Sequence, residues 1–180
     1  GIFGYLSSNK YKPDKFKLIN ATKELKNRGP DNFGCYERLT KNYIFLGHQR
    51  LSIIDLDSAA NQPMVSDDNR FVLIYNGEIY NHLYLRNYLI TNYNVLFKTN
   101  SDTETLLNLL IFLGIDKSLD LLDGMFAFCL YDNLKNQIII SRDRVGEKPL
   151  YLNFNKDYMC FSSDLKSFKN LPNFQNNLNH

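Results

Sequence analysis

The chain has 180 residues, of which 44% are hydrophobic and 22% charged, with a formal net charge of +2. This length suits one globular domain that buries roughly 70% of the surface its unfolded form exposes. The basic residues are scattered and no apolar run approaches the ~18 residues that cross a bilayer, so neither nucleic acid nor a membrane is an expected partner.

Strand and helix signals alternate along almost the whole chain. Strands are predicted at 2–5, 33–39, 43–47, 50–54, 71–75, 125–132, 137–143, 149–152 and 158–163. Helices are predicted at 14–27, at 81–91 and from 101 onward, with a final helical turn at 163–168. The apolar faces of the first two helices would carry Phe16, Ile19, Leu25, Leu83, Leu85, Tyr88 and Leu89. Ser101 and Glu104 open the third helix with a capping box, in which each side chain accepts a hydrogen bond from the other's backbone N–H.

The strand at 125–131 has apolar side chains on both faces, which indicates that both faces are covered. The turns that link it to its neighbours are short, and this favours antiparallel pairing. An antiparallel sheet covered on both faces suggests that it packs on a second sheet, with helices outside. The predicted fold is therefore an α+β, four-layer αββα sandwich of two antiparallel sheets.

Cys35, Cys129 and Cys160 lie at irregular spacing, and the three histidines form no ligand cluster with them. Neither a metal site nor a disulfide framework is expected, and a reducing compartment such as the cytoplasm is favoured. Because free cysteine is readily buried, all three are predicted to be buried structural thiols.

Asn76-Gly77 follows the apolar run at 71–75 and allows two interpretations. Asn-Gly between two strands is a strong hairpin signal, but the residues after Glu78 read as a helix and not as a returning strand. The alternative is a strand end that presents the Asn76 carboxamide and the Gly77 N–H together. Two such neutral donors can form an oxyanion hole, which stabilises the charge on a carbonyl oxygen under attack.

Three charged residues near this motif also allow two interpretations. Arg50 interrupts an apolar strand pattern, where a buried guanidinium needs an anion, either an internal carboxylate or that of a substrate. Glu78 and Asp102 fit helix N-termini, where acidic side chains are favourable, or the binding of an ammonium group. Together with the amides of Asn76 and Gly77, they fit an amino acid whose side chain carries an amide or acyl group.

A set of motifs in fixed order carries a resemblance to a known family. They are GIFG (1–4), RGPD (28–31), GHQRLSIIDL (47–56), QPM (62–64), YNGEIYN (75–81), SDTE (101–104), LDGMFAFCLYD (122–132), RDRVGEKPLYL (142–152) and FSSDLKSF (161–168). These motifs resemble the glutaminase domain of glutamine-dependent asparagine synthetases, a class II glutamine amidotransferase. The resemblance covers residues 1–168, and 169–180 would be a linker toward a synthetase domain outside this sequence.

The resemblance implies the N-terminal-nucleophile hydrolase fold and a glutaminase reaction. In this family an N-terminal Cys attacks the side-chain amide of L-glutamine and its own α-amino group moves the proton. A thioester forms, ammonia leaves, and water releases glutamate. Asn76 and Gly77 would form the oxyanion hole, Arg50 would bind the substrate carboxylate, and Glu78 and Asp102 would bind its ammonium group. The substrate-binding residues would be Arg50, Leu51, Ser52, Ile53, Ile54, Asn76, Gly77, Glu78 and Asp102.

The family's sequence begins Cys-Gly-Ile-Phe-Gly, whereas this one begins at Gly1. The nucleophile is therefore expected immediately before Gly1, and the chain in this form is expected to be inactive. Three explanations are open: a cysteine of the natural protein that lies outside this sequence, a disordered cysteine, or a degenerate, non-catalytic amino-acid-binding homologue similar to β-lactam synthetase. The first is favoured because the residues expected to bind the substrate are intact.

The sequence contains neither a Gly-Gly-Asp-Ser nor a GxxxxGK[ST] phosphate loop, so no cofactor is expected in this domain. ATP and Mg²⁺ would act only in the synthetase domain, with aspartate as the favoured ammonia acceptor and sugars or peptide carboxylates as alternatives. The charged residues of 142–148 are predicted to form structural ion pairs, or else to contact that domain. The charge pattern fits either a monomer or a homodimer.

Overall fold

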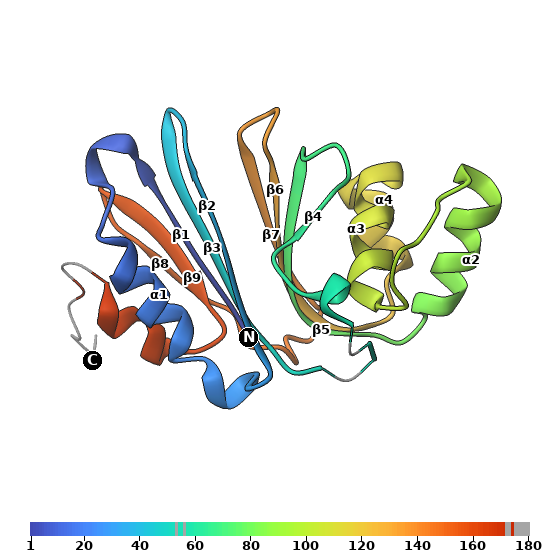
Figure 1. Cartoon of the computed structure of the whole chain (residues 1–180), viewed down its shortest axis with the longest axis horizontal. Coiled ribbons are helices and arrows are strands. Elements are labelled where there is room, and N and C mark those ends of the chain that lie inside the picture. Colours follow the sequence, from blue (N-terminus) through green and yellow to red (C-terminus); the bar gives the residue numbers. More distant parts are fainter. Residues whose placement is uncertain (53, 56, 172–173, 175–180) are drawn as a thin grey trace. The chain divides into compact units, whose positions relative to one another are not determined.

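The computed structural model describes residues 1–52, 54–55, 57–171 and 174, and the chain divides into two compact units. Unit 1 comprises Gly1–Leu51 and Pro149–His180, and unit 2 comprises Ser52–Lys148. Each unit contains one antiparallel sheet with helices on one of its faces (Figure 1). The predicted α+β class and the antiparallel pairing are confirmed.

Unit 1 contains a five-stranded sheet in the order β2-β3-β1-β9-β8. Its strands are β1 (Ile2–Ser8), β2 (Asn32–Leu39), β3 (Asn42–Arg50), β8 (Tyr151–Phe154) and β9 (Tyr158–Ser162). Its helical segments are α1 (Lys15–Lys23) and the 3₁₀ turns η1 (Asn9–Tyr11), η2 (Lys26–Arg28) and η4 (Leu165–Asn170). α1 and η4 lie together over one face of the sheet (Figure 1), where Phe3, Tyr5 and Phe45 form part of the core.

Unit 2 contains a four-stranded sheet in the order β4-β5-β6-β7. Its strands are β4 (Met64–Val65), β5 (Phe71–Ile79), β6 (Gly124–Asp132) and β7 (Gln137–Arg142). Its helices are α2 (His82–Tyr93), α3 (Asp102–Leu113), α4 (Ile115–Leu121) and the 3₁₀ turn η3 (Ser58–Ala60). α3 packs on β5, and α2 packs on α3. Both faces of β6 are buried as predicted, since the side chains of residues 126–131 are at most 6% exposed.

The apolar face predicted for the first helix is confirmed for Leu25 and for Ile19, which packs against the core, but it is wrong for Phe16. Phe16 is 73% exposed, whereas Leu18 and Leu25 are fully buried, together with Thr22. Leu18 and Thr22 lie four residues apart on one face of α1, and Leu25 follows shortly after the helix ends. The helix approaches β3 so closely at Thr22 that a Cβ on Gly47 would lie 2.2 Å from the Thr22 hydroxyl oxygen. A face that must come this near to a sheet is built from smaller side chains, and the large Phe16 is left outside.

The two strands predicted at 43–47 and 50–54 are one strand and an irregular segment. β3 runs unbroken from Asn42 to Arg50, because β1 and β2 pair with it on its two sides. After Arg50 no described residue up to Asp57 belongs to a strand, and Ile53 lies outside the described residues. Strand pairing, which the local pattern does not reveal, therefore sets the end of β3.

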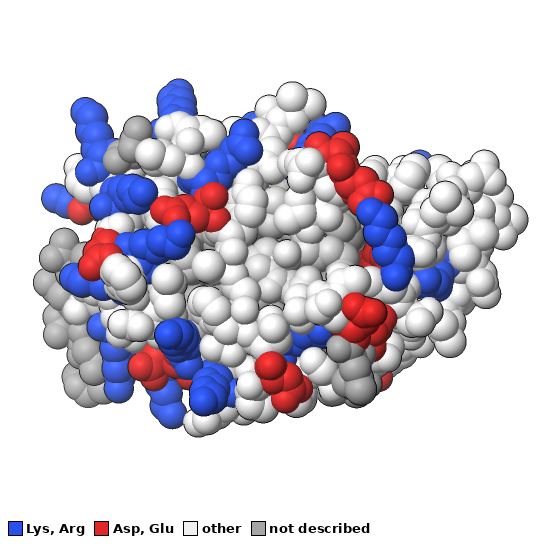
Figure 2. All heavy atoms as spheres, in the orientation of Figure 1, with Lys and Arg blue, Asp and Glu red and all other residues white. Residues whose placement is uncertain are grey.

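α2 has apolar side chains around most of its circumference. Leu85 and Leu89 are buried as predicted, but Leu83 and Tyr84 are 65% and 66% exposed. Arg86 is the charged residue of this helix, and Figure 2 shows few charged side chains over α2 on the face drawn. None of the described helices is both long enough and apolar enough to cross a membrane.

A bidentate ion pair joins the ends of β5 and β6. Arg70 Nη2 and Nε donate to the two carboxylate oxygens of Asp132, at 2.7 and 3.1 Å. Asp132 is 4% exposed and also accepts the N–H groups of Leu134 and Lys135. The Arg70 hydrogen bond, helped by these backbone donors and opposed by burial, lowers the pKa of Asp132 below its ordinary value.

Because the folded-state pKa of Asp132 lies below the value of ~3.9 in an unfolded chain, its carboxylate stabilises the fold above that pH. The stabilisation is lost as the pH falls through the folded-state pKa. Asp132→Asn is therefore expected to lower the free energy of unfolding by about 1–3 kcal/mol at pH 7, and by less near pH 2. Urea unfolding at several pH values measures this, with the exposed Asp120→Asn as the control. If the loss in free energy of unfolding stays constant down to pH 2, the effect comes from packing and not from the carboxylate charge.

Candidate functional site

Asn76 and Gly77 lie inside strand β5, so the hairpin interpretation is wrong. β5 runs from Phe71 to Ile79, four residues beyond its predicted end, and pairs with β6 over this whole length. The residues just before this motif are buried, whereas Asn76, Gly77 and Glu78 are partly exposed. This strand therefore presents three consecutive functional groups at an accessible position.

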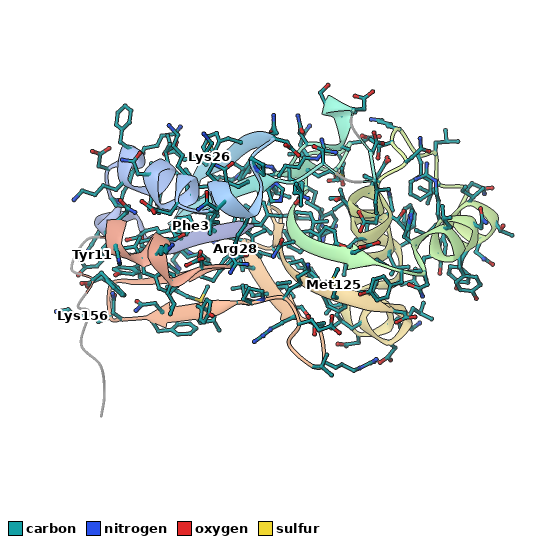
Figure 3. All side chains as sticks on the ribbon, turned by 90° about the horizontal axis from the view of Figure 1, so that it is seen from below. Phe3, Tyr11, Lys26, Arg28, Met125 and Lys156 are labelled. Atoms are coloured by element: carbon teal, nitrogen blue, oxygen red, sulfur yellow. The ribbon has the colours of Figure 1, made fainter. Side chains whose placement is uncertain are left out.

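Gly77 is required where β5 and β6 approach each other. A Cβ at this position would lie 2.2 Å from the carbonyl oxygen of Met125 and 2.7 Å from Cα of Phe126. Met125 is labelled in Figure 3, near the start of β6. Any side chain at residue 77 would have to displace the backbone of β6, so glycine serves a close approach here and not a turn.

The edge of β5 that faces away from β6 is held by side chains. β4 pairs with β5 only at Val72 and Leu73, near the start of β5. Further along, Gln62 Oε1 accepts the N–H of Tyr75 at 2.6 Å. Asp102 Oδ2 accepts the N–H of Ile79 at 3.1 Å. Because N–H groups two residues apart in a strand point toward the same edge, the N–H of Gly77 lies on this edge between them.

Asp102 is the first residue of α3 and is 5% exposed. Its Oδ2 accepts two hydrogen bonds, from the Tyr75 hydroxyl at 2.7 Å and from the N–H of Ile79 at 3.1 Å. Among the described residues, its Oδ1 accepts none. Burial and the neighbouring Asp102 carboxylate raise the pKa of Tyr75 well above its ordinary value, so this hydroxyl keeps its proton. The structure thus brings Asp102 next to the strand segment that carries Gly77 and Glu78.

The capping box at the start of α3 forms in one direction only. Ser101 Oγ accepts the N–H of Glu104 at 3.2 Å, as predicted. The carboxylate of Glu104, however, accepts the N–H of Lys98 at 2.9 Å, and both the N–H and the hydroxyl of Thr99 at 2.7 Å. Glu104 is 8% exposed. By binding residues further back in the chain, it folds the preceding segment against α3 and fixes where Asp102 lies.

Other predicted substrate-binding residues follow Arg50 in the chain. Leu51 and Ile54 are 54% and 38% exposed, and Ser52 is half-buried. In unit 2, Asp55 Oδ2 accepts the N–H of Asn100 at 2.8 Å. This bond joins the end of the stretch to the segment that leads into α3.

Arg50 is the last residue of β3, in unit 1, and is 7% exposed. Its carbonyl accepts the N–H of Asp31 at 3.0 Å. Gly29 packs so closely that a Cβ there would lie 2.6 Å from the carbonyl carbon of Arg50. One residue earlier, the carbonyl of Gln49 accepts a hydrogen bond from the nitrogen of Gly1 at 2.6 Å. Arg50 therefore lies beside the first residue of the chain.

Gln62 and Tyr75 belong to the candidate site and were missed by sequence reasoning. Gln62 is 7% exposed and Tyr75 is 3% exposed. A signal was available, because a tyrosine inside a buried apolar run needs a partner for its hydroxyl. The sequence did not reveal which partner, since Asp102 lies 27 residues further along the chain.

The charged segment 142–148 does not form the predicted ion pairs. The ion pairs among the described residues involve none of its side chains. Instead, the carboxylate of Asp143 accepts the N–H groups of Phe126, Glu147 and Lys148, at 3.3, 2.8 and 3.0 Å. Burial alone would raise the pKa of Asp143, but the backbone donors outweigh it and hold the pKa below its ordinary value. Backbone hydrogen bonds therefore attach this segment to the start of β6.

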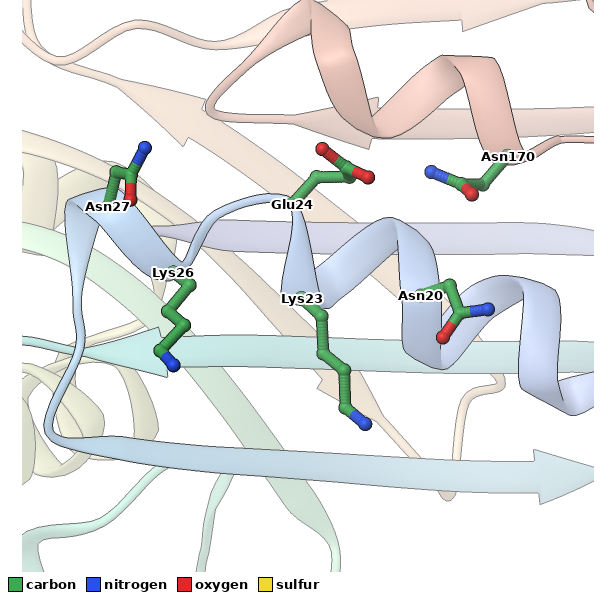
Figure 4. Close-up of a pocket in the computed structure, with 6 residues that line it drawn as sticks. All are labelled: Asn20, Lys23, Glu24, Lys26, Asn27 and Asn170. Carbon is green, nitrogen blue, oxygen red and sulfur yellow. The ribbon is translucent and has the colours of Figure 1, made fainter.

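A polar pocket of about 370 Å³ lies at the C-terminal end of α1, in unit 1. It is lined by Asn20, Lys23, Glu24, Lys26, Asn27 and Asn170. Glu24 and Asn170 point toward one another across it (Figure 4). Five of the six lining residues are exposed, and none was predicted to bind a substrate.

Cys129 and Cys160 are buried as predicted, but Cys35 is exposed. Cys35 lies on β2, which is an edge strand of its sheet. Burial raises the pKa of Cys160 to about 12, so it is not a thiolate at neutral pH. In the part of the chain that the structure describes, no group of three or more His, Cys, Asp or Glu side chains could hold a metal ion.

Comparison with known proteins matches residues 1–180 to the glutamine amidotransferase domain family. A probable glutamine-hydrolysing asparagine synthetase from Schizosaccharomyces pombe is 43% identical over 156 residues, which are 85% of this chain and 27% of that protein. A putative glutamine-hydrolysing asparagine synthetase 2 from Methanocaldococcus jannaschii is 39% identical over 167 residues, 84% of this chain and 32% of that protein. The chain therefore spans about a third or less of the length of these curated relatives.

Among solved structures, the chain is similar to the glutamine phosphoribosylpyrophosphate amidotransferase from B. subtilis complexed with ADP and GMP. The TM-score is 0.77 over 94% of this chain and 43% of that one. At 22% identity, this likeness shows the fold alone. The family is shown by the match of residues 1–180 together with the identities of about 40% to the two relatives: the chain belongs to the glutamine amidotransferase domain family.

Proposed function

We propose that this chain is the glutamine-hydrolysing domain of an asparagine synthetase. It would cleave the side-chain amide of L-glutamine to glutamate and ammonia, and the ammonia would pass to a synthetase domain of the same protein. The family match supports the hydrolysis. The names and the greater length of the relatives support the second domain and aspartate as the acceptor. Residues 169–180 would lead toward that domain.

A cysteine immediately before Gly1 is proposed as the nucleophile. β1 pairs with β3 so that Ile2 lies opposite His48, and Gly1 bonds to Gln49. A residue that precedes Gly1 and continues this pairing would lie opposite Arg50. Its thiol would attack the amide carbon of glutamine, while its own α-amino group takes the thiol proton and passes it to the leaving ammonia. Water would then cleave the thioester, releasing glutamate and restoring the thiol.

The negative oxygen that develops in both steps would be stabilised by the Asn76 carboxamide and the Gly77 N–H. The observation that carries this assignment is the edge of β5. There the N–H of Gly77 lies on the side away from β6, between bonds made by Gln62 and Asp102. A backbone N–H held in a strand is already oriented, so it needs little reorganisation when the charge forms.

The charged ends of glutamine are assigned to one cation and two acids. The planar guanidinium of Arg50 would bind the α-carboxylate through two parallel hydrogen bonds. Asp102, through Oδ1, and Glu78 would bind the α-ammonium group. The segment from Leu51 to Ile54 would complete the binding site.

Hydrolysis at this domain is proposed to need no cofactor, with ATP and Mg²⁺ acting only in the synthetase domain. The cytoplasm is the compartment we propose. The odd number and irregular spacing of the three cysteines favour a reducing environment.

Glutamate release by the full-length natural protein tests the proposal. With L-glutamine, EDTA and no ATP, we expect glutamate and ammonia in equal amounts, and mass spectrometry should find Cys before Gly1 at the native N-terminus. The matched control is the same protein beginning at Gly1, which should bind glutamine without releasing glutamate. A native N-terminus without Cys, or glutamine binding without release, would instead indicate a non-catalytic amino-acid-binding domain.

A further inference from the structure

Tyr75 is held at three points where the core of unit 2 meets the edge of β5. Its ring is 3% exposed and belongs to the core that β5 forms with α3. Its N–H donates to Gln62 Oε1 at 2.6 Å. Its hydroxyl donates to Asp102 Oδ2 at 2.7 Å. A side chain fixed in this way has one orientation for its hydroxyl.

Gln62 connects the same edge to α3. Its Nε2 donates to the hydroxyl of Thr103 at 3.3 Å, and both residues are buried. Asp102, one residue earlier, binds the N–H of Ile79. The first turn of α3 is therefore tied to β5 at residues 75 and 79, two residues on either side of Gly77.

The bond from Tyr75 decides which oxygen of Asp102 remains available. Oδ2 accepts both the Tyr75 hydroxyl and the N–H of Ile79, and among the described residues Oδ1 accepts no hydrogen bond. A carboxylate held by two donors on one oxygen cannot rotate freely, so Oδ1 is presented in a fixed direction. An ammonium group, which has three donors and no acceptor, would bind at this free oxygen.

We propose that Tyr75 is a positioning residue, whose hydroxyl orients the Asp102 carboxylate so that Oδ1 accepts a hydrogen bond from the α-ammonium group of glutamine. This inference rests on the proposed function. It adds a residue that contacts no substrate and sets the specificity for the α-amino group through Asp102. Tyr75 would thus contribute to substrate binding more than to the chemical step.

The test is Tyr75→Phe in the full-length natural protein, because it removes only the hydroxyl and keeps the buried ring. KM for L-glutamine is expected to rise about tenfold, the effect of one hydrogen bond to a charged group, with kcat within about twofold. The matched control is Tyr131→Phe in the neighbouring strand β6. Tyr131 is fully buried and its hydroxyl donates to Asn136 at 3.0 Å, and this variant should leave KM unchanged.

A substrate without the amino group separates positioning from a general structural effect. The probe is 4-carbamoylbutanoate, which is glutamine with hydrogen in place of the α-ammonium group. The ratio of kcat/KM for glutamine to that for the probe should fall about tenfold in Tyr75→Phe and stay constant in Tyr131→Phe. Both substrates are compared in one preparation, so partial unfolding does not change the ratio.

Two failures can be told apart. An unchanged ratio in Tyr75→Phe, with glutamate release intact in the unsubstituted protein, would overturn this inference alone. Absence of glutamate release from the unsubstituted protein would overturn the proposed function, and this inference with it.

Discussion

Asn76→Ala is expected to lower kcat for glutamine hydrolysis by about 10²–10³-fold, with little change in KM. The carboxamide of Asn76 would donate to an oxygen that carries its full negative charge only in the transition state. Its loss therefore removes an interaction that the bound substrate does not yet make. Steady-state glutamate release by the full-length protein measures both constants.

Asn133→Ala is the control for this prediction. The Asn133 side chain also belongs to unit 2 and donates to a backbone carbonyl, that of Asn69, at 2.8 Å. It lies at the opposite end of the β5–β6 pair, next to Asp132, and its loss should leave kcat nearly unchanged. A fall of less than about tenfold in Asn76→Ala would remove this carboxamide from the oxyanion site, because a single lost donor costs far more.

The sequence indicated which residues to consider for the candidate site, but not the strands and contacts in which they lie. Asn76 and Gly77 lie side by side in β5, but the predicted strand ends at Tyr75, where the apolar run stops. Its real end at Ile79 is set by pairing with β6, a partner some 50 residues away. The local sequence around Gly77 is typical of a turn. Glycine is needed here for another reason, because a Cβ at this position would clash with the carbonyl oxygen of Met125.

The sequence also did not reveal which backbone N–H groups donate to the buried carboxylates. A capping box relates residues three apart, so the pattern Ser101–Glu104 led to a reciprocal pair. The buried Glu104 instead accepts the N–H groups of Lys98 and Thr99, which lie in a bend before the helix. The charged residues of 142–148 were likewise expected to pair by charge. A buried carboxylate surrounded by backbone N–H groups needs no cation, as Asp143 shows.

The two sheets were easier to predict than the buried faces of the helices. Strand alternation and short turns are local properties, and they correctly gave two antiparallel sheets. Which face of α1 is buried depends on how closely the helix approaches β3. At Gly47 the helix and the strand come so close that the buried face carries the small Thr22, while Phe16 is exposed. Hydrophobicity alone ranks these two residues in the opposite order.

Arg50→Ala is expected to weaken glutamine binding by about 2–5 kcal/mol, because it removes one partner of a desolvated charge pair. Arg50 is 7% exposed at the end of β3, where Asp31 and Gly29 fix its main chain. The main chain of Arg50 is therefore held at the end of the sheet. Arg50→Lys should show an intermediate loss, since an ammonium keeps the charge but cannot form two parallel hydrogen bonds. Calorimetric titration with glutamine and with glutamate measures the affinity.

Arg38→Ala is the matched control, because Arg38 is an exposed arginine on the neighbouring strand β2. Its removal should leave the affinity for both ligands unchanged. If Arg50→Ala also kept its affinity while losing stability in urea, the partner of Arg50 would be an internal group, and the α-carboxylate would need another cation. If the affinity falls for both ligands by the same factor, the lost contact is to the part that they share. That part is the α-amino-acid end and not the side-chain amide, which only glutamine carries.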